Sequence, residues 1–542
     1  MAYLSDVIGD KYKKWQKGFV LIKAGTGCGK THFILTILTK YAMENNKKIL
    51  FLVNRTKLKE QLAPSLSSMQ EKTFEERLDS ICDEYVEDDL MLAHAFDAET
   101  KNYMHHLAFG NTEESYPYLN LTLLTYQKFE SLLSKGKMKK YDYIICDEFH
   151  YFINDSSFSD STELSYRYIM NMGIHKKAII VLMSASPWYL ENFLKRKKYL
   201  SSNRIYKMPA DYSYVRGIRL YLFIQYQKQI EYILDKHKES RIMFFTNNPS
   251  VYAYFYENHN DISCFIANEK SKTYEKYSPL MTVGNLVEYE PNQWTFNPDK
   301  RICITTSVID NGVSIKDKSI NYIFCDFDDI SQVVQAFGRK RKLGDDDWCY
   351  FYLQNYNTLP EMEKRTEQAL LARLIKKKMY PEFNEYVQQH NLFFNLSQFF
   401  MNYPMLKLVC CGAKHGLYRF TLRKPLYHQL CWIIEQDYEI RKFTYKEFVK
   451  KYIPELSDKI YIMFYDQKRI KRLLESYEND IITKEQRKVF LDTLSEYAPS
   501  FTNKTISKVN ELLVQCKIPY TLESKRFNGG RGESYWKIDK TE

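Results

Sequence analysis

Short apolar runs alternate with helical patterns over the first 210 residues of the chain. The runs are rich in β-branched and aromatic residues, whereas the stretches between them place apolar residues every three or four positions. This alternation predicts a parallel sheet with helices on both faces, because parallel strands need a crossover connection. The predicted strands are residues 19–23, 49–53, 121–124, 143–146 and 178–183.

The alternation returns after residue 210 and predicts a second α/β domain over 211–355. Its predicted strands are residues 219–224, 242–245, 302–305, 322–325 and 348–353. An acidic stretch at about 66–120 interrupts the first domain, 1–210, and is predicted to be an insertion. Beyond residue 355 the spacing predicts a helical basic region over 356–480 and a separate module over 481–542.

Composition places the chain among folded globular proteins. Of its 542 residues, 44% are hydrophobic and 27% are charged, which excludes a disordered chain, a collagen-like fibre and a small disulfide scaffold. No apolar run approaches the roughly 20 residues that cross a bilayer, so no membrane association is expected. The first residues lack the apolar core of a secretory signal, and we expect the cytoplasm.

Charge and cysteine content change this picture only slightly. The formal net charge of +11 permits a polyanionic partner such as nucleic acid without requiring one. The eleven cysteines form no C-x-x-C pair, so a structural metal site is not expected.

A phosphate-binding loop is the strongest chemical signal. Residues 24–31 read AGTGCGKT between a predicted strand and a predicted helix, which is the context of a P-loop. The predicted nucleotide-binding residues are Ala24, Gly25, Thr26, Gly27, Cys28, Gly29, Lys30 and Thr31. Ala24 replaces the usual first glycine. The glycines let backbone N–H groups surround a phosphate, Lys30 neutralises its charge, and the Thr31 hydroxyl is a Mg²⁺ ligand. ATP and Mg²⁺ are therefore the predicted cofactors; a glycine-rich turn without a ligand is the alternative.

Two adjacent carboxylates end a second apolar strand in the sequence YDYIICDEFH. Asp147 is predicted to hold Mg²⁺ through water, and Glu148 to act as the general base for the attacking water. His150 then lies where it can respond to the γ-phosphate. Alone, such a pattern is more often a solvated turn, but here it follows the phosphate loop in the order that ATPases use.

Six further motifs follow the order of one helicase family. They are LVNRTKLKEQL at 52–62, TYQ at 125–127, SAS at 184–186, RIMFFTNN at 241–248, TTSVIDNGVSI at 305–315 and QVVQAFGRKRK at 332–342. The chain thus resembles superfamily 2 helicases of the D-E-x-H group and is similar to phage and viral replication helicases. The resemblance implies two tandem RecA-like P-loop domains with parallel sheets. It also implies nucleic-acid contacts by Arg55, Gln61, Thr125, Gln127, Asn247 and Thr306, and a nucleotide contact by Asp310.

The last of these motifs implies catalytic groups from the second domain. Gln335 would lie near the γ-phosphate, and Arg339 with a second cation would stabilise its charge. The family's commoner pattern ends in arginine where this chain has Lys342, while Arg341 stands one position earlier. Some viral and phage relatives carry that shorter spacing, so Arg341 is the favoured second cation.

The end of the chain reads as a helix, a strand, a turn at 528–530 and a second strand. Lys525, Arg526 and Arg531 flank the turn, with Tyr535 and Trp536 behind it, as in a winged-helix module that binds nucleic acid. A hairpin that only caps the helical region is an equal alternative. The expected fold class is thus α/β, with two RecA-like domains and a mainly helical C-terminal region that ends in a winged-helix-like hairpin.

The leading functional hypothesis is an ATP-dependent helicase or translocase that acts on nucleic acid, with DNA favoured over RNA. Its protein partner would belong to replication, recombination or defence. Two alternatives stay open: an RNA helicase, and a nucleic-acid-stimulated ATPase that acts as a nucleotide-switched clamp or sensor without unwinding. Stimulated ATP hydrolysis without strand displacement would select the clamp, and a stable co-purifying partner would select the sensor.

Overall fold

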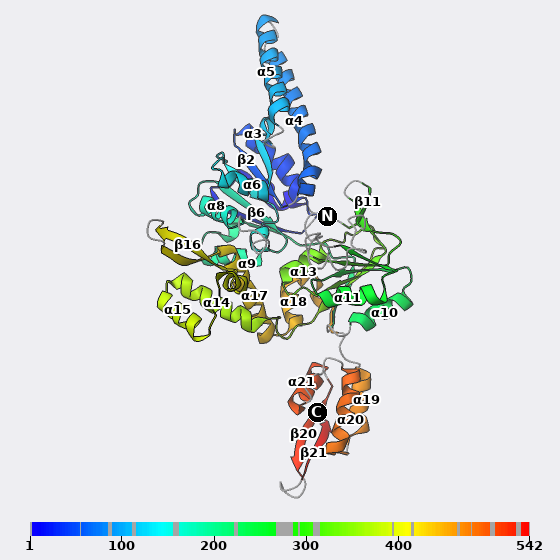
Figure 1. Ribbon diagram of the computed structural model, residues 1–542. Coiled ribbons are helices and arrows are strands. Elements are labelled where there is room, and N and C mark those ends of the chain that lie inside the picture. The colour runs from blue at the N-terminus through cyan, green and yellow to red at the C-terminus, as the bar shows by residue number, and fades with distance from the viewer. Residues whose placement is uncertain are drawn as a thin grey trace.

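The computed structural model (Figure 1) describes residues 3–25, 27–54, 56–84, 89–110, 115–154, 162–221, 226–266, 286–290, 293–306, 315–392, 395–412, 417–462, 467–478, 480–498, 505–516, 518–526 and 533–540. Within them, no helix combines the length and apolarity that a bilayer crossing requires.

The first α/β domain is built on a seven-stranded sheet in the order β3-β4-β2-β5-β6-β1-β7. All neighbours are parallel except β3 and β4, so the predicted parallel sheet is confirmed. Its central strands are buried on both faces, which explains their unbroken apolar runs. The strands are β1 (Gly18–Ala24), β2 (Ile49–Val53), β3 (Ser115–Tyr116), β4 (Leu121–Thr125), β5 (Tyr143–Cys146), β6 (Ile179–Ser184) and β7 (Ile205–Met208).

Helices cover both faces of this sheet, and their apolar sides form two core clusters, one on each face. The helices are α1 (Leu4–Ile8), η1 (Gly9–Lys14), α2 (Lys30–His32), η2 (Phe33–Leu38), α3 (Thr39–Glu44), η3 (Pro117–Leu119), α6 (Tyr126–Ser134), α7 (Tyr151–Asn154), α8 (Thr162–Ile174), α9 (Trp188–Arg196) and η5 (Ser202–Arg204). The helix after the phosphate loop passes through a π-helical segment, η2, a feature that often marks functional sites.

The predicted insertion is an arm of two long helices, α4 (Thr56–Glu84) and α5 (Asp89–Gly110), which lie side by side and project away from the sheet (Figure 1). Phe74 and Tyr103 stack at 4.0 Å between ring centroids and join the two helices. The acidic composition of this stretch predicted an insertion but not a pair of helices. The second helix was missed because its own hydrophobic periodicity is weak.

The second α/β domain has a fully parallel sheet in the order β10-β13-β9-β14-β15-β8-β18. Its elements are β8 (Val215–Tyr221), α10 (Tyr226–Lys236), β9 (Arg241–Phe245), α11 (Pro249–Asn258), β10 (Ser263–Ile266), β11 (Leu286–Glu290), β12 (Gln293–Phe296), β13 (Ile302–Thr305), β14 (Ile320–Cys325), α13 (Ile330–Phe337) and β15 (Cys349–Gln354). The edge strand β18 (Ile460–Ile462) comes from far along the chain. The C-terminal region therefore completes this sheet.

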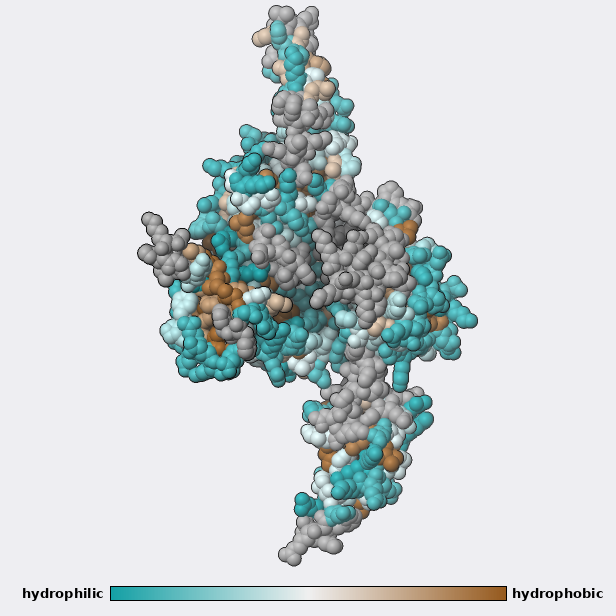
Figure 2. Space-filling model, viewed as in Figure 1, coloured by the Kyte–Doolittle hydropathy of each residue, from teal (hydrophilic) through white to brown (hydrophobic). Residues whose placement is uncertain are grey.

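That region packs against both α/β domains. It consists of α14 (Met362–Lys377), α15 (Tyr380–Gln389), α16 (Leu396–Asn402), β16 (Leu406–Gly412), β17 (Leu417–Leu422), α17 (Lys424–Lys442), α18 (Tyr445–Tyr452) and η11 (Pro454–Lys459). It is mainly helical, as predicted, but it includes the β16–β17 hairpin, which the sequence reading missed. In the coloured part of Figure 2 hydrophilic residues predominate, and apolar residues gather around α14 and this hairpin.

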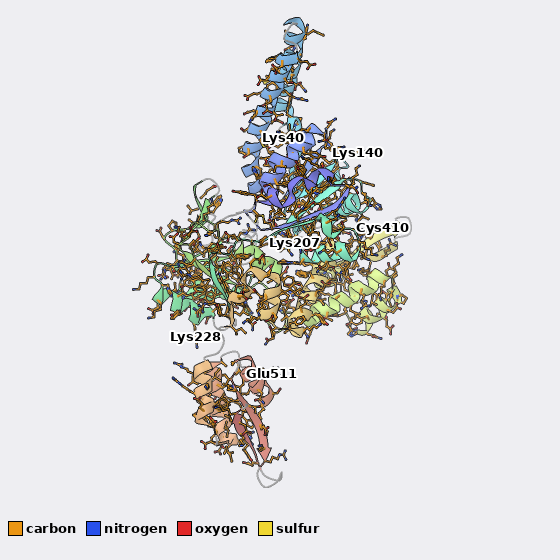
Figure 3. The ribbon with its side chains drawn as sticks, turned by 180° about the vertical axis from the view of Figure 1, so that it is seen from behind. Lys40, Lys140, Lys207, Lys228, Cys410 and Glu511 are labelled. Carbon is orange, nitrogen blue, oxygen red and sulfur yellow. The ribbon has the colours of Figure 1, made fainter. Side chains whose placement is uncertain are left out.

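The last part of the chain folds around a core of its own. Its elements are α19 (Gln467–Ser476), β19 (Ile481–Ile482), α20 (Lys484–Tyr497), α21 (Ile506–Gln515), β20 (Tyr520–Arg526) and β21 (Ser534–Lys540). The antiparallel strands lie in the order β19-β21-β20, and the sequence of helices and strands is that of a winged helix. Seen from behind, Glu511 on α21 marks this module (Figure 3).

Two sequence expectations change in this module. Ile470 and Leu474 of α19 belong to its core, so we propose its boundary before Gln467 rather than at 480/481. Trp536, one of the two aromatic residues noted behind the predicted turn, is 7% exposed and lies in that core. Its ring lies below Arg487, whose guanidinium carbon is 4.9 Å from the ring centroid.

Candidate active site

The phosphate loop leaves the carboxyl end of β1 and turns into α2. Gly27 and Gly29 have φ of +84° and +81°, a conformation that side chains rarely adopt. Gly29 caps the helix, and its carbonyl accepts a hydrogen bond from Phe33 N at 2.9 Å. At Gly25 a Cβ would lie 3.2 Å from Ala210, so glycine allows the interdomain linker to approach. Thr26 lies outside the described residues.

Lys30 is held between the loop and the second predicted motif. Its Nζ donates to the Ala24 carbonyl at 3.1 Å and lies 3.2 Å from Glu148 Oε1. Both side chains are largely buried, at 8% and 13% exposure, so the ion pair is poorly screened by solvent. Thr31 follows in α2 and is half-buried. The cation predicted to neutralise phosphate thus pairs with the predicted general base.

The two carboxylates have opposite electrostatics. Burial, followed by the charge on Glu148, raises the pKa of Asp147 to about 6. Burial also opposes the ionisation of Glu148, but the Lys30 ammonium and a hydrogen bond from His150 outweigh it and hold the pKa of Glu148 below its usual range. Glu148 also has a φ of +45°, a strained conformation that is typical of functional positions.

The environment of Asp147 fits a bound cation. The residue is 6% exposed, and its Oδ1 has no hydrogen-bond partner within the described residues. An unpartnered buried carboxylate oxygen is costly unless a cation or water satisfies it. Asp147 and Thr31 thus offer oxygen atoms of the kind that bind Mg²⁺ beside a nucleotide, with water and phosphate oxygens as further ligands.

Tyr126 is a positioning residue that the sequence reading missed. It is fully buried, its hydroxyl donates to the Asp147 carbonyl at 2.8 Å, and its ring stacks on Tyr151 at 4.3 Å. It lies between Thr125 and Gln127, which were both predicted to contact nucleic acid. The central residue of that motif thus holds the backbone of the carboxylate motif.

A chain of hydrogen bonds runs from the first domain into the second. His150 Nδ1 lies 3.1 Å from Ser184 Oγ, which accepts from Ser186 N at 3.1 Å. Ser186 Oγ in turn accepts from Gln335 Nε2 at 3.0 Å. All four residues are buried. The SAS motif therefore connects His150 to the helix of the last motif, and Gln335 contacts it across the domain boundary.

The four cations at 339–342 have separate environments. A Cβ at Gly27 would lie 3.4 Å from Arg341 Nη1, so this guanidinium lies against the phosphate loop. Burial, followed by the charge on Arg339, lowers the pKa of Arg341 to about 10. Lys340 is fully buried and pairs with Asp347 at 2.9 Å, whereas Lys342 pairs with the exposed Asp345 at 3.1 Å.

These groups surround one cavity of about 710 Å³ between the two α/β domains. Its lining includes Gly27, Cys28, Glu148, Gln335, Arg339 and Arg341. The linker at 208–214 and residues 451–455 of the C-terminal region complete the walls. Seen from behind, Lys207 marks the junction of the two domains beside this linker (Figure 3). The cleft thus joins the phosphate loop, the predicted general base and two arginines of the other domain.

The predicted nucleic-acid residues lie at the carboxyl ends of strands. Thr125 caps α6 by accepting from Lys128 N at 3.2 Å, and Gln127 is exposed on α6. Asn247 is exposed after β9, and Thr306 is half-buried after β13. Arg55, Asp310 and Arg531 lie outside the described residues, as does the side chain of Gln61 in α4. Lys525 and Arg526 are exposed on β20, where Lys525 lies 3.2 Å from Glu523.

Asn54 is a second residue that the sequence reading missed. It directly follows β2 and precedes α4, next to the position where Thr125 ends the paired strand. It is 3% exposed, and neither polar atom of its side chain has a partner within the described part of the chain. At the start of a helix, the Nδ2 group of this amide can donate to an anionic ligand, whereas its Oδ1 atom needs a separate donor.

Comparison with known proteins gives one family match. Residues 4–188 match the family described as Type III restriction enzyme, res subunit. No curated protein sequence matches the chain.

Two solved structures illustrate the distant likeness. One is S. cerevisiae Dbp5 bound to RNA and ADP BeF3, with 12% identity, a TM-score of 0.36, and coverage of 63% of this chain and 80% of that one. The other is a hypothetical ATP-dependent RNA helicase from Sulfolobus tokodaii, with 14% identity, a TM-score of 0.25, and coverage of 67% and 93%. Scores this low carry no weight beside the sequence match. By that match, which covers residues 4–188, and by the order of its motifs, the chain is similar to superfamily 2 helicases.

Proposed function

We propose that the protein is an ATP- and Mg²⁺-dependent motor that moves along or unwinds DNA. The observation that carries the proposal is the position of Arg341: a guanidinium of the second domain lies against Gly27 of the phosphate loop, in the cavity that Glu148 also lines. A nucleotide in this cleft would contact both domains, so its hydrolysis would change how they hold each other.

Each group in the cleft has a separate role in the proposed hydrolysis of ATP. Backbone N–H groups at Gly27 and Gly29 surround the phosphates, and Lys30 exchanges its contact with Glu148 for the β- and γ-phosphate oxygens. Glu148, ionised and released, accepts a proton from the attacking water. Arg339 and Arg341 stabilise the charge on the transferred phosphoryl group. Thr31 and Asp147 would hold Mg²⁺, which supplies further charge neutralisation when bound.

Hydrolysis would reach the nucleic acid through the buried chain from His150 to Gln335. Loss of the γ-phosphate removes the charge that holds Arg339 and Arg341 to the first domain. Asn54 and Thr125 lie on the first domain, and Asn247 and Thr306 on the second. A shift between the domains would therefore change the distance between these two sets of phosphate-binding residues. The bound nucleic-acid strand would move as a result.

The terminal module supports DNA as the substrate. Its order of elements is that of a winged helix, and Lys525 and Arg526 are exposed on the strand that leads into the wing. We place the motor in DNA replication, recombination or defence.

A clamp that hydrolyses ATP without unwinding is a second candidate. One continuous apolar core includes residues of both α/β domains and of the C-terminal region. Such a core favours small rearrangements over wide opening of the cleft. Hydrolysis stimulated by nucleic acid, with no strand displacement, would identify this function.

The test measures ATP hydrolysis and strand displacement by the full chain with single-stranded DNA, duplex DNA and RNA in turn. We expect stimulation by DNA together with displacement. Stimulation by RNA alone would overturn the substrate, and equal rates with and without nucleic acid would overturn the motor. A chain that ends at residue 462 should bind DNA more weakly, with a flatter salt dependence. Unchanged affinity would show that the module does not contact phosphates.

A further inference from the structure

Helix α17 of the C-terminal region contacts the helix of the last helicase motif. Trp432 and Gln436 lie four positions apart and so share one face of α17. They are 2% and 0% exposed, and both side chains reach the first turn of α13. No helicase motif includes α17, which begins 82 residues after the end of the last one.

The contact with α13 is made of directed hydrogen bonds. Asp329 caps α13 by accepting from Ser331 N at 2.9 Å. The same carboxylate oxygen accepts from Trp432 Nε1 at 2.9 Å and from Gln436 Nε2 at 3.1 Å. The other end of the Gln436 amide accepts from Ile330 N at 2.9 Å. Gln436 thus fixes both the cap residue and the first residue of the helix.

The same helix contacts the first domain. Tyr189 OH lies 2.8 Å from His428 Nδ1, and the rings of Trp188 and Trp432 stack at 6.4 Å. Trp188 and Tyr189 begin α9, which follows the SAS motif directly. His150, Ser186, Ser331 and Trp432 all line one small cavity. Trp432 therefore lies where the first domain, α13 and α17 meet. Figure 1 shows α9, α13 and α17 near one another in the middle of the molecule.

We propose that Gln436 and Trp432 are positioning residues for ATP hydrolysis. They hold the amino end of α13, and this sets where Gln335, Arg339 and Arg341 lie in the nucleotide cleft. The inference rests on the proposed ATPase function and extends it to a region outside every helicase motif.

Because α13 is short, the position of its amino end strongly affects the arginines that follow the helix. Helix α13 has eight residues and is about 12 Å long, so a small tilt at Ile330 displaces the arginines that follow Phe337. Misplacement of a reacting group by about 1 Å can cost a hundredfold in rate. The network is also buried and fully paired, and such networks rigidify the structure around them.

Alanine at Gln436 is the first test, in the full-length protein. Gln436→Ala should lower kcat by about tenfold to a hundredfold, with KM and the affinity for a fluorescent ATP analogue within about twofold of wild type, because the phosphate loop is untouched. The matched control is Asp437→Asn. Asp437 is buried on the same helix, but it accepts from Thr358 Oγ1 and Leu359 N instead of contacting α13. The kcat of Asp437→Asn should stay within about threefold of wild type.

A pH profile separates positioning from a merely structural role. Gln436→Glu keeps the acceptor for Ile330 N–H, but once ionised it has no donor for Asp329 and places two carboxylates together. A protonated glutamate regains the donor. The ratio of the variant's kcat to that of wild type should therefore rise as pH falls from 8 to 6.

Each outcome is decisive. A flat ratio for Gln436→Glu, or a loss in Gln436→Ala that appears in KM and not in kcat, would overturn the positioning role while leaving the ATPase intact. Absence of ATP hydrolysis in the wild-type protein would overturn the proposed function, and this inference with it. Thermal unfolding of each variant shows whether a lost rate reflects loss of the fold.

Discussion

Gln335 of the second α/β domain donates from Nε2 to Ser186 Oγ of the first domain over 3.0 Å, and both residues are buried. Ser186 is also linked through Ser184 to His150, two residues beyond Glu148. This contact therefore joins the predicted general base to the helix that precedes the two arginines of the cleft.

A double-mutant cycle tests this contact. Ser186→Ala and Gln335→Ala should each lower kcat about tenfold, because a buried hydrogen bond contributes about 1 kcal/mol and its loss leaves a partner unsatisfied. The double variant should be no slower than either single one, since both remove the same interaction. Steady-state rates of ATP hydrolysis by wild type, the two single variants and the double variant give the coupling between the two side chains. Independent effects that multiply would show that the two side chains are not coupled.

Arg341 and Lys342 are the two candidates for the second catalytic cation, and substitutions at each can be compared directly. Arg341→Ala should lower kcat by about a thousandfold, as loss of an arginine finger does, with nucleotide binding retained. Lys342→Ala is the control, because its ammonium pairs with the exposed Asp345, and its kcat should stay within about threefold. Single-turnover hydrolysis with saturating ATP distinguishes them. A large loss in Lys342→Ala and none in Arg341→Ala would reverse the assignment.

The raised pKa of Asp147 predicts that the free energy of unfolding depends on pH. Its pKa rises to about 6 on folding, mainly through burial, so folding favours the protonated form. The associated stability is present at low pH and is lost as pH rises through 6. Asp147→Asn should therefore be more stable than wild type at pH 8, on the order of 3 kcal/mol, and the gain should shrink between pH 6 and pH 4.

Thermal unfolding without nucleotide or Mg²⁺ measures this difference. Hydrolysis should be lost in Asp147→Asn at every pH. An equal melting temperature of variant and wild type at pH 8 would show that the buried carboxylate carries no such penalty.

Lys340 should matter for stability. Its ammonium and the Asp347 carboxylate are almost fully buried, at 1% and 0% exposure. Lys340→Ala leaves that carboxylate uncompensated and should cost about 3–5 kcal/mol, whereas replacing both residues with apolar ones should restore much of the loss. Denaturant unfolding gives these values. A change below about 1 kcal/mol in Lys340→Ala would place the pair in solvent instead.

The sequence predicted well those parts of the fold that local pattern controls. Strands 49–53, 143–146 and 302–305 appear with the predicted bounds, because buried parallel strands are continuous apolar runs. The family resemblance led to the residues of the cleft, since its motifs carry fixed spacings. Positions outside the described residues, such as Arg55 and Asp310, stay predictions.

Other features depend on contacts between distant parts of the chain, and the sequence alone does not reveal them. Gln436 and Asp329 are 107 positions apart, and no local pattern marks their contact. Strand β18 has only three residues, and it is a strand because it pairs with the edge of β8. The position of Trp536 behind the predicted turn did not reveal that its side chain packs in the core of the terminal module.

Hydrolysis by wild type and Lys30→Ala, measured beside their nucleotide and DNA affinities, tests the central claim most directly. That claim is a single nucleotide cleft built by both α/β domains. We expect DNA-stimulated turnover in wild type, and in Lys30→Ala no turnover but DNA binding that is still measurable at low salt. Retained hydrolysis in Lys30→Ala would contradict the account.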